Sequence, residues 1–153
     1  MTKISLIYGA WIDLIEDTLP SYARITNGLS IEDAPSIVLR KGYAFIPTDG
    51  ENSERLICGN KSYVRSFDIV LVNQVLATEN NTTTWDTLIK ALHEDVASMF
   101  HAVENSSILN DMTNGLGTSK ITGDSGINFV ATDEASKYFQ IFISAETEYF
   151  ESL

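Results

Sequence analysis

The 153-residue sequence contains a single cysteine, Cys58, so a disulfide bond within the chain is excluded. It has no apolar run near the roughly 20 residues that a membrane-spanning helix needs. Near the N-terminus, Asp13, Glu16 and Asp17 interrupt the apolar residues, which is not the pattern of a secretory signal peptide. The sequence therefore gives no support to a membrane location or to an oxidising compartment.

Basic residues are also scarce, with 10 Lys and Arg against 21 Asp and Glu and a net charge of -11. A protein that binds nucleic acid tightly needs clustered Lys and Arg to neutralise phosphates. The longest basic run in this sequence is Arg40-Lys41. An acidic surface repels DNA, which is useful where DNA must slide past, although solubility explains the same charge more simply. We expect no tight binding to DNA.

The remaining composition is that of a globular protein, with 44% hydrophobic and 20% charged residues. The length fits one domain, residues 1–153, which can bury a core without a metal or a disulfide.

Two stretches have the apolar spacing of amphipathic helices. Residues 3–19 place apolar side chains on one face, and Pro20 ends the pattern. Residues 85–104 form the second stretch, with Thr83 or Thr84 as the expected N-cap. Its apolar stripe consists of Trp85, Leu88, Leu92, Val96, Met99 and Val103.

Four stretches are typical of strands: residues 36–46, 62–77, 118–131 and 137–150. The second would be roughly 50 Å long if unbroken, and we expect it to project beyond a compact core. In the last, Phe139 and Ile141 point to one side, and Gln140, Glu146 and Glu148 point to the other. The sequence thus predicts an α+β fold in the order α-β-β-α-β-β, with two helices on a mixed or antiparallel sheet of about four main strands.

The motifs that suggest catalysis or metal binding are each incomplete. Gly123-Asp124-Ser125-Gly126 is similar to the nucleophile turn of chymotrypsin-like proteases, but Ile127-Asn128 follow instead of Gly-Pro, and a plain turn is the better interpretation. His93 lacks a second histidine four residues on, where a zinc-protease helix carries one. Residues 110–121 lack the acidic ligands of a calcium loop. We predict no catalytic residues, no metal and no cofactor.

The order of elements resembles the tail terminator (tail completion) proteins of long-tailed bacteriophages. The resemblance covers residues 4–150 and is carried by ISLIYGAWIDLIEDTLP, YVRSFDIVLVNQVLA, TWDTLIKALHEDVASMF and YFQIFISAETEYF. It implies a non-enzymatic virion protein that is assembled in the host cytoplasm and located in the tail. Such a protein forms a ring, usually of six subunits, that caps the tail tube. Its partners would be its own copies, the tube protein and a head-completion or neck protein, and DNA would pass through its channel without specific binding.

Two sets of residues are assigned roles on this interpretation. Asp49, Glu51, Glu54 and Arg55, in the turn-rich segment 47–61, would contact a partner, although a solvated hairpin tip explains them equally well. Asp68, Glu146 and Glu148 would face the channel. The long strand 62–77 would offer unpaired backbone to a neighbouring subunit.

A second hypothesis remains open: a monomeric α+β domain that binds or converts a small molecule in a cleft beside residues 110–126.

Overall fold

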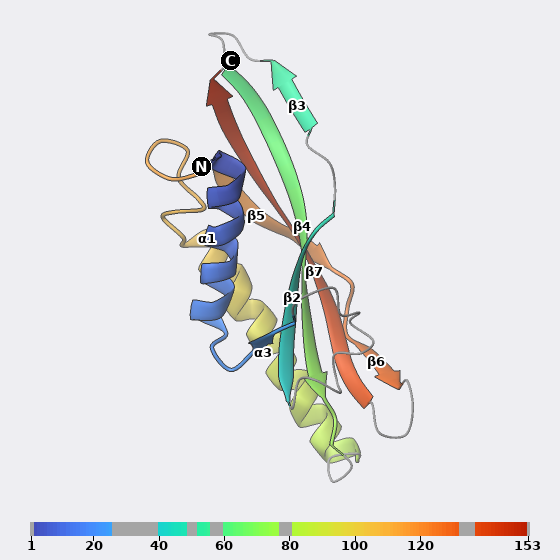
Figure 1. The fold of residues 1–153 in the computed structure, drawn as a ribbon. Coiled ribbons are helices and arrows are strands. Elements are labelled where there is room, and N and C mark those ends of the chain that lie inside the picture. The colour runs from blue at the N-terminus through green and yellow to red at the C-terminus, as the bar shows by residue number, and fades with distance from the viewer. Residues whose placement is uncertain are drawn as a thin grey trace.

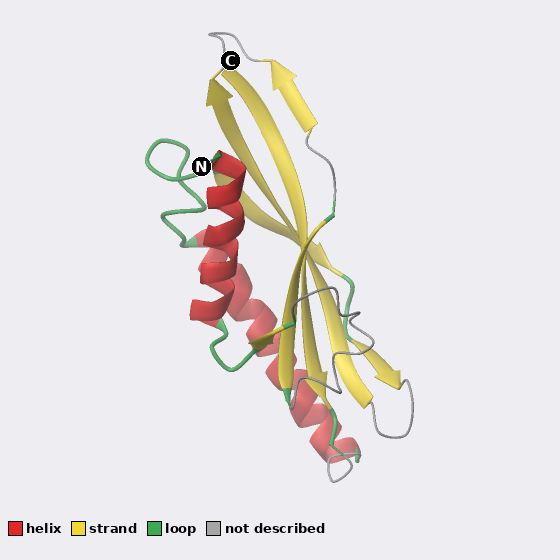
Figure 2. Ribbon diagram, in the orientation of Figure 1, coloured by secondary structure: helices red, strands yellow, loops and turns green. Residues whose placement is uncertain are grey.

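A layer of two helices packs against one face of a twisted β-sheet in the computed structural model of the chain (Figures 1 and 2). The structure describes residues 2–25, 40–48, 52–55, 60–76, 81–131 and 137–152, with the backbone alone at 52–55, 60–61 and 151–152. The elements are α1 (Lys3–Thr18), β1 (Ala23–Arg24), β2 (Lys41–Pro47), β3 (Asn52–Arg55), β4 (Asn60–Gln74), α3 (Thr82–Glu104), β5 (Thr118–Asp124), β6 (Asn128–Ala131) and β7 (Lys137–Ser152). The α+β class and the two helices are confirmed.

Helix α1 agrees with the sequence prediction to within a residue. The Thr2 hydroxyl accepts a hydrogen bond from the Ser5 amide and caps the first turn. Ile7, Trp11 and Ile15, four residues apart, are fully buried and anchor the helix to the sheet. The helix ends just before Pro20, which lacks the amide needed to continue it.

Helix α3 begins earlier than the periodicity predicted, and its N-cap is Asn81, so the assignment to Thr83 or Thr84 is wrong. The Asn81 carboxamide oxygen accepts from the Thr84 amide at 2.9 Å, and both threonines lie inside the helix. Apolar periodicity starts only at Trp85 and therefore could not locate this polar first turn. The predicted stripe is buried at Leu92, Val96, Met99 and Val103.

The pairing of β4 with β7 forms the middle of the sheet. It runs without interruption from Asn60 opposite Ser152 to Gln74 opposite Tyr138. On its other side, β4 pairs with β2 and, further along, with β3. The expectation that the long strand exposes unpaired backbone is therefore wrong, because β7 covers its whole length on one side and β2 and β3 cover most of it on the other.

The sheet has seven strands within the described residues, against about four predicted, in the order β1-β2-β4-β7-β5 with β3 beside β4 and β6 beside β7. The parallel β1–β2 pair makes the sheet mixed. The predicted strand 118–131 is divided into β5 and β6 by a turn in which Gly126 has a φ of 77° and donates its amide to the Asp124 carboxylate. The Gly123–Gly126 motif is thus a turn, as expected. The three additional strands are too short to show a periodicity of their own.

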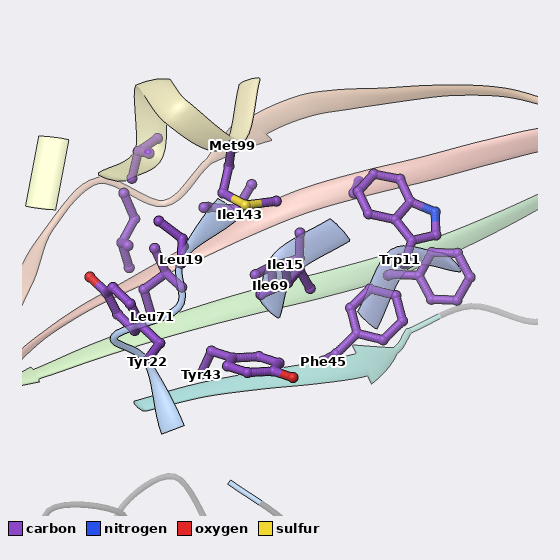
Figure 3. Close-up of a cluster of buried hydrophobic side chains, with 14 of the residues drawn as sticks. Trp11, Ile15, Leu19, Tyr22, Tyr43, Phe45, Ile69, Leu71, Met99 and Ile143 are labelled. Carbon is purple, nitrogen blue, oxygen red and sulfur yellow. The ribbon is translucent and has the colours of Figure 1, made fainter. Parts of the chain in front are cut away.

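The core lies between the helices and the odd-numbered residues of the central strands. Trp11, Phe45 and Phe67 form a cluster of aromatic rings there, with Phe45 and Phe67 stacked at 4.8 Å between centroids. Figure 3 shows Trp11 and Phe45 with Ile15, Ile69 and Ile143 in this layer. The indole N–H of Trp11 donates to the Thr147 hydroxyl at 2.7 Å, and Ser119 bonds the same hydroxyl at 2.7 Å. These polar groups are buried but satisfied.

Leu92→Ala should lower the free energy of unfolding by about 2–5 kcal/mol, because Leu92 is 1% exposed and its loss leaves a cavity. Chemical denaturation followed by circular dichroism measures this change. The adjacent exposed residue provides the control, since His93→Ala should leave the midpoint nearly unchanged. An unchanged midpoint for Leu92→Ala would place the core on another face of α3.

Thr147→Val keeps the shape of the side chain but removes the acceptor of the Trp11 N–H. We expect a loss of about 1–3 kcal/mol for the buried N–H left without a partner. Thr118→Val, an exposed position on β5, is the matched control. Equal denaturation midpoints for the two variants would show that the buried hydrogen bond does not stabilise the core.

Candidate functional site

The sheet face that points away from the helices is divided into two halves. At the end near β1 and β6, a small apolar cluster to which neither helix contributes is formed by Ala44, Val70, Val72 and Tyr138. Towards the other end, the same face of β4 and β7 carries Asp68, Glu146 and Glu148. These three carboxylates are named the acidic sheet face below.

The register of β4 and β7 brings the three acids together. Asp68 lies opposite Ser144 and Glu146 lies opposite Ser66, so Asp68 and Glu146 are diagonal neighbours, a relation that spans about 7–8 Å. Glu148 is two residues beyond Glu146 and points to the same side. The prediction from alternation that Glu146 and Glu148 share a face is confirmed, and Asp68 joins them on the adjacent strand.

Each glutamate contacts a polar partner among the described residues. The Lys120 ammonium on β5 lies 3.3 Å from the Glu146 carboxylate, and the Ser62 hydroxyl donates to Glu148 at 3.1 Å. The Lys120 side chain is 65% exposed, so this ion pair contributes at most about 1 kcal/mol in water. The two glutamates together with Lys120 therefore keep a net negative charge. Sequence reasoning missed Lys120 because the register between β5 and β7 has no local signal.

The proposed partner-contacting residues are only partly within the described structure. Asp49 and Glu51 lie outside the described residues. Glu54 and Arg55 lie in β3, where only the backbone is described, and this backbone pairs with β4. The segment 47–61 is thus not a loop throughout. The role of all four residues stays a prediction.

The segment between α3 and β5 contains a hollow of about 360 Å³, close to the cleft that the second hypothesis expected. Its lining includes Ser107, Asp111 and Asn114 but none of the residues 118–126. The Asp111 carboxylate accepts from the amides of Thr113 and Asn114 at 2.9 and 3.0 Å. These two bonds, the Asn114 amide first, hold the pKa of Asp111 below its usual value. The Asp111 carboxylate therefore has a structural role in stabilising this turn.

Comparison with known proteins does not identify the chain. No protein-family model matches it, and a search of the curated proteins finds no match.

Histidines and acids do not combine into a metal-binding group in the part of the chain that the structure describes. His93 and His101 are exposed on α3, and no group of three His, Cys, Asp or Glu in that part is arranged to hold a metal ion. No helix among the described residues is long and apolar enough to cross a membrane. The acidic sheet face and the surface of the helical layer are therefore the features from which a function is argued.

Asp111→Ala should destabilise the protein at neutral pH, and the difference from wild type should shrink as the pH falls below about 4. The folded state lowers the pKa of Asp111, so its ionised form stabilises the fold above the unfolded pKa and loses that effect on protonation. Denaturation midpoints at pH 7, 5 and 3 measure the difference.

Asp111→Asn is the control, because its side chain retains an oxygen acceptor that does not titrate. The difference between Asp111→Asn and Asp111→Ala should therefore not depend on pH. If the denaturation midpoint of the wild type exceeds that of Asp111→Ala by as much at pH 3 as at pH 7, the stabilising role of the ionised Asp111 carboxylate is contradicted.

Proposed function

We propose that the protein is a structural virion protein of the tail-terminator type, which forms a ring at the head-proximal end of a phage tail tube and leaves a channel for DNA. The observation that carries the proposal is the acidic sheet face, where Asp68, Glu146 and Glu148 lie together on the side away from both helices. In the ring, this face lines the channel.

The charge of this face suits passage of DNA without binding. Carboxylates repel the phosphates of the duplex, whereas Lys and Arg would neutralise them and retain the DNA. The ammonium of Lys120 lies against the patch and is paired with Glu146. The net charge of -11 on the whole chain also repels DNA.

The two edges of the sheet offer a way to join subunits. Strand β5 is the last strand on one side of the sheet path, and β1 and β2 lie on the other. The β5 edge of one subunit can pair with the opposite edge of the next subunit, so that the contact repeats head to tail. Such contacts close into a ring when the rotation between neighbouring subunits divides a full turn evenly. This replaces the long strand as the element that joins subunits.

The direction of hydrogen bonding on β7 identifies the backbone groups at the β5 edge. The Val75 amide donates to the Lys137 carbonyl, so the odd residues of β7 bond to β4. The even residues of β7 then bond to β5, and Lys120 lies opposite Glu146. Ser119 and Ile121 consequently direct their backbone groups away from β7, toward the open edge.

The second hypothesis, a small-molecule-binding or enzymatic domain, is favoured by one observation, the hollow at residues 107–116. It requires no self-association. The mass of the native protein therefore distinguishes the two proposals.

The wild-type protein at high concentration should form particles with a mass that is a multiple of 16.9 kDa, six subunits being expected, and rings should be visible by negative-stain microscopy. Ile121→Pro removes the outward N–H and should abolish the assembly, because proline cannot donate to a neighbouring strand. Ile121→Ala is the matched control, since it shortens the same half-buried side chain but keeps the N–H.

Two outcomes would contradict the proposal. A protein that stays monomeric at millimolar concentration, with no ring in the virion, would remove the ring and favour the second hypothesis. Submicromolar and salt-sensitive binding to duplex DNA would be incompatible with an acidic channel lining.

A further inference from the structure

A groove of about 390 Å³ lies between α1 and the segment that follows α3. Figure 1 shows that this segment lies beside α1. Two apolar side chains in its lining are largely exposed, Leu6 at 45% and Ile108 at 57%. These are the two most exposed large apolar side chains among the described residues. Exposed apolar surface in a concave site is typical of a protein interface.

The floor of the groove is open at Gly9. A Cβ atom built on Gly9 would have no neighbouring atom within 4 Å, so an occupant can approach the α1 backbone closely there. Leu6, Gly9, Asp13 and Asp17 are three or four positions apart and form one stripe of α1. The stripe is about 16 Å long, which corresponds to three turns of a helix lying alongside.

The charges of the groove are of one sign. Asp13 and Asp17 are exposed in its lining, and none of the residues that line it is basic. Lys3 is the one basic residue of α1, and its ammonium is bonded to the Phe150 carbonyl at 3.0 Å. A complementary occupant therefore combines apolar side chains with Lys or Arg.

We propose that this groove binds an amphipathic helix of a different protein, with apolar side chains three or four positions apart that contact Leu6 and Ile108 and with basic residues that pair with Asp13 and Asp17. A second copy of this chain is a poor occupant. Its net charge is -11, and the apolar faces of its α1 and α3 are already buried in the core. The inference does not depend on ring formation.

Selection from a library of random 12-residue peptides displayed on a carrier, with the wild-type protein as bait, tests the proposal. Enriched sequences should share apolar pairs at helical spacing together with Lys or Arg. A synthetic copy of an enriched peptide should bind in a fluorescence anisotropy titration, and its affinity should fall as salt is raised.

Variants locate the site. Gly9→Leu places a side chain in the groove at a position where an added Cβ meets no atom, and it should weaken peptide binding roughly tenfold or more. Ile108→Asn should weaken binding to a similar extent. Asp13→Asn combined with Asp17→Asn should weaken it about threefold to tenfold and reduce the salt dependence. Ile46→Asn makes the same substitution at another exposed isoleucine, on β2, and should leave the affinity unchanged. Circular dichroism of each variant checks that the fold is retained.

The proposal is overturned if no peptide is enriched, or if the enriched peptides lack basic residues. It is also overturned if Gly9→Leu binds the peptide as well as the wild type does. If the wild type is a dimer and Gly9→Leu is a monomer, a second copy of the chain occupies the groove instead.

Discussion

The antiparallel pairing of β4 with β7 is the interaction on which the other elements depend. These two strands lie more than 60 residues apart in the chain, yet they pair along all 15 residues of β4. Every other strand attaches to this pair directly or through β2, with β2 and β3 on β4 and β5 and β6 on β7. The side-chain alternation of the pair then defines two faces, and both helices pack on one of them.

Placing both helices on one face separates the stabilising and the exposed parts of the molecule. The helix-facing side holds the aromatic cluster and the buried hydrogen bonds of Thr147, which join α1 to β7 and β5. On the other side, where neither α1 nor α3 packs, the sheet carries Asp68, Glu146 and Glu148. Carboxylates are tolerated there because that face keeps its charges accessible to water, whereas the core would have to desolvate them.

The two proposed surfaces lie on opposite layers of the protein. The acidic sheet face belongs to the outer side of the sheet, and the groove beside Gly9 belongs to the helical layer. If the sheets of a ring line its channel, the helical layers face outward and the groove stays accessible to another protein. The two proposals are therefore compatible with each other, although each is tested on its own.

Local periodicity in the sequence determined both helices, three of the four predicted strands and the shared face of Glu146 and Glu148, because side-chain spacing depends only on the geometry of one element. The fourth, 118–131, is two strands. The N-cap at Asn81 was missed because the first turn of α3 is polar. Only the tertiary structure decided the pairing of β4 with β7, the contact between Lys120 and Glu146, and the groove between α1 and Ile108. These features depend on which distant segments meet and in what register, and no short stretch of sequence carries that information.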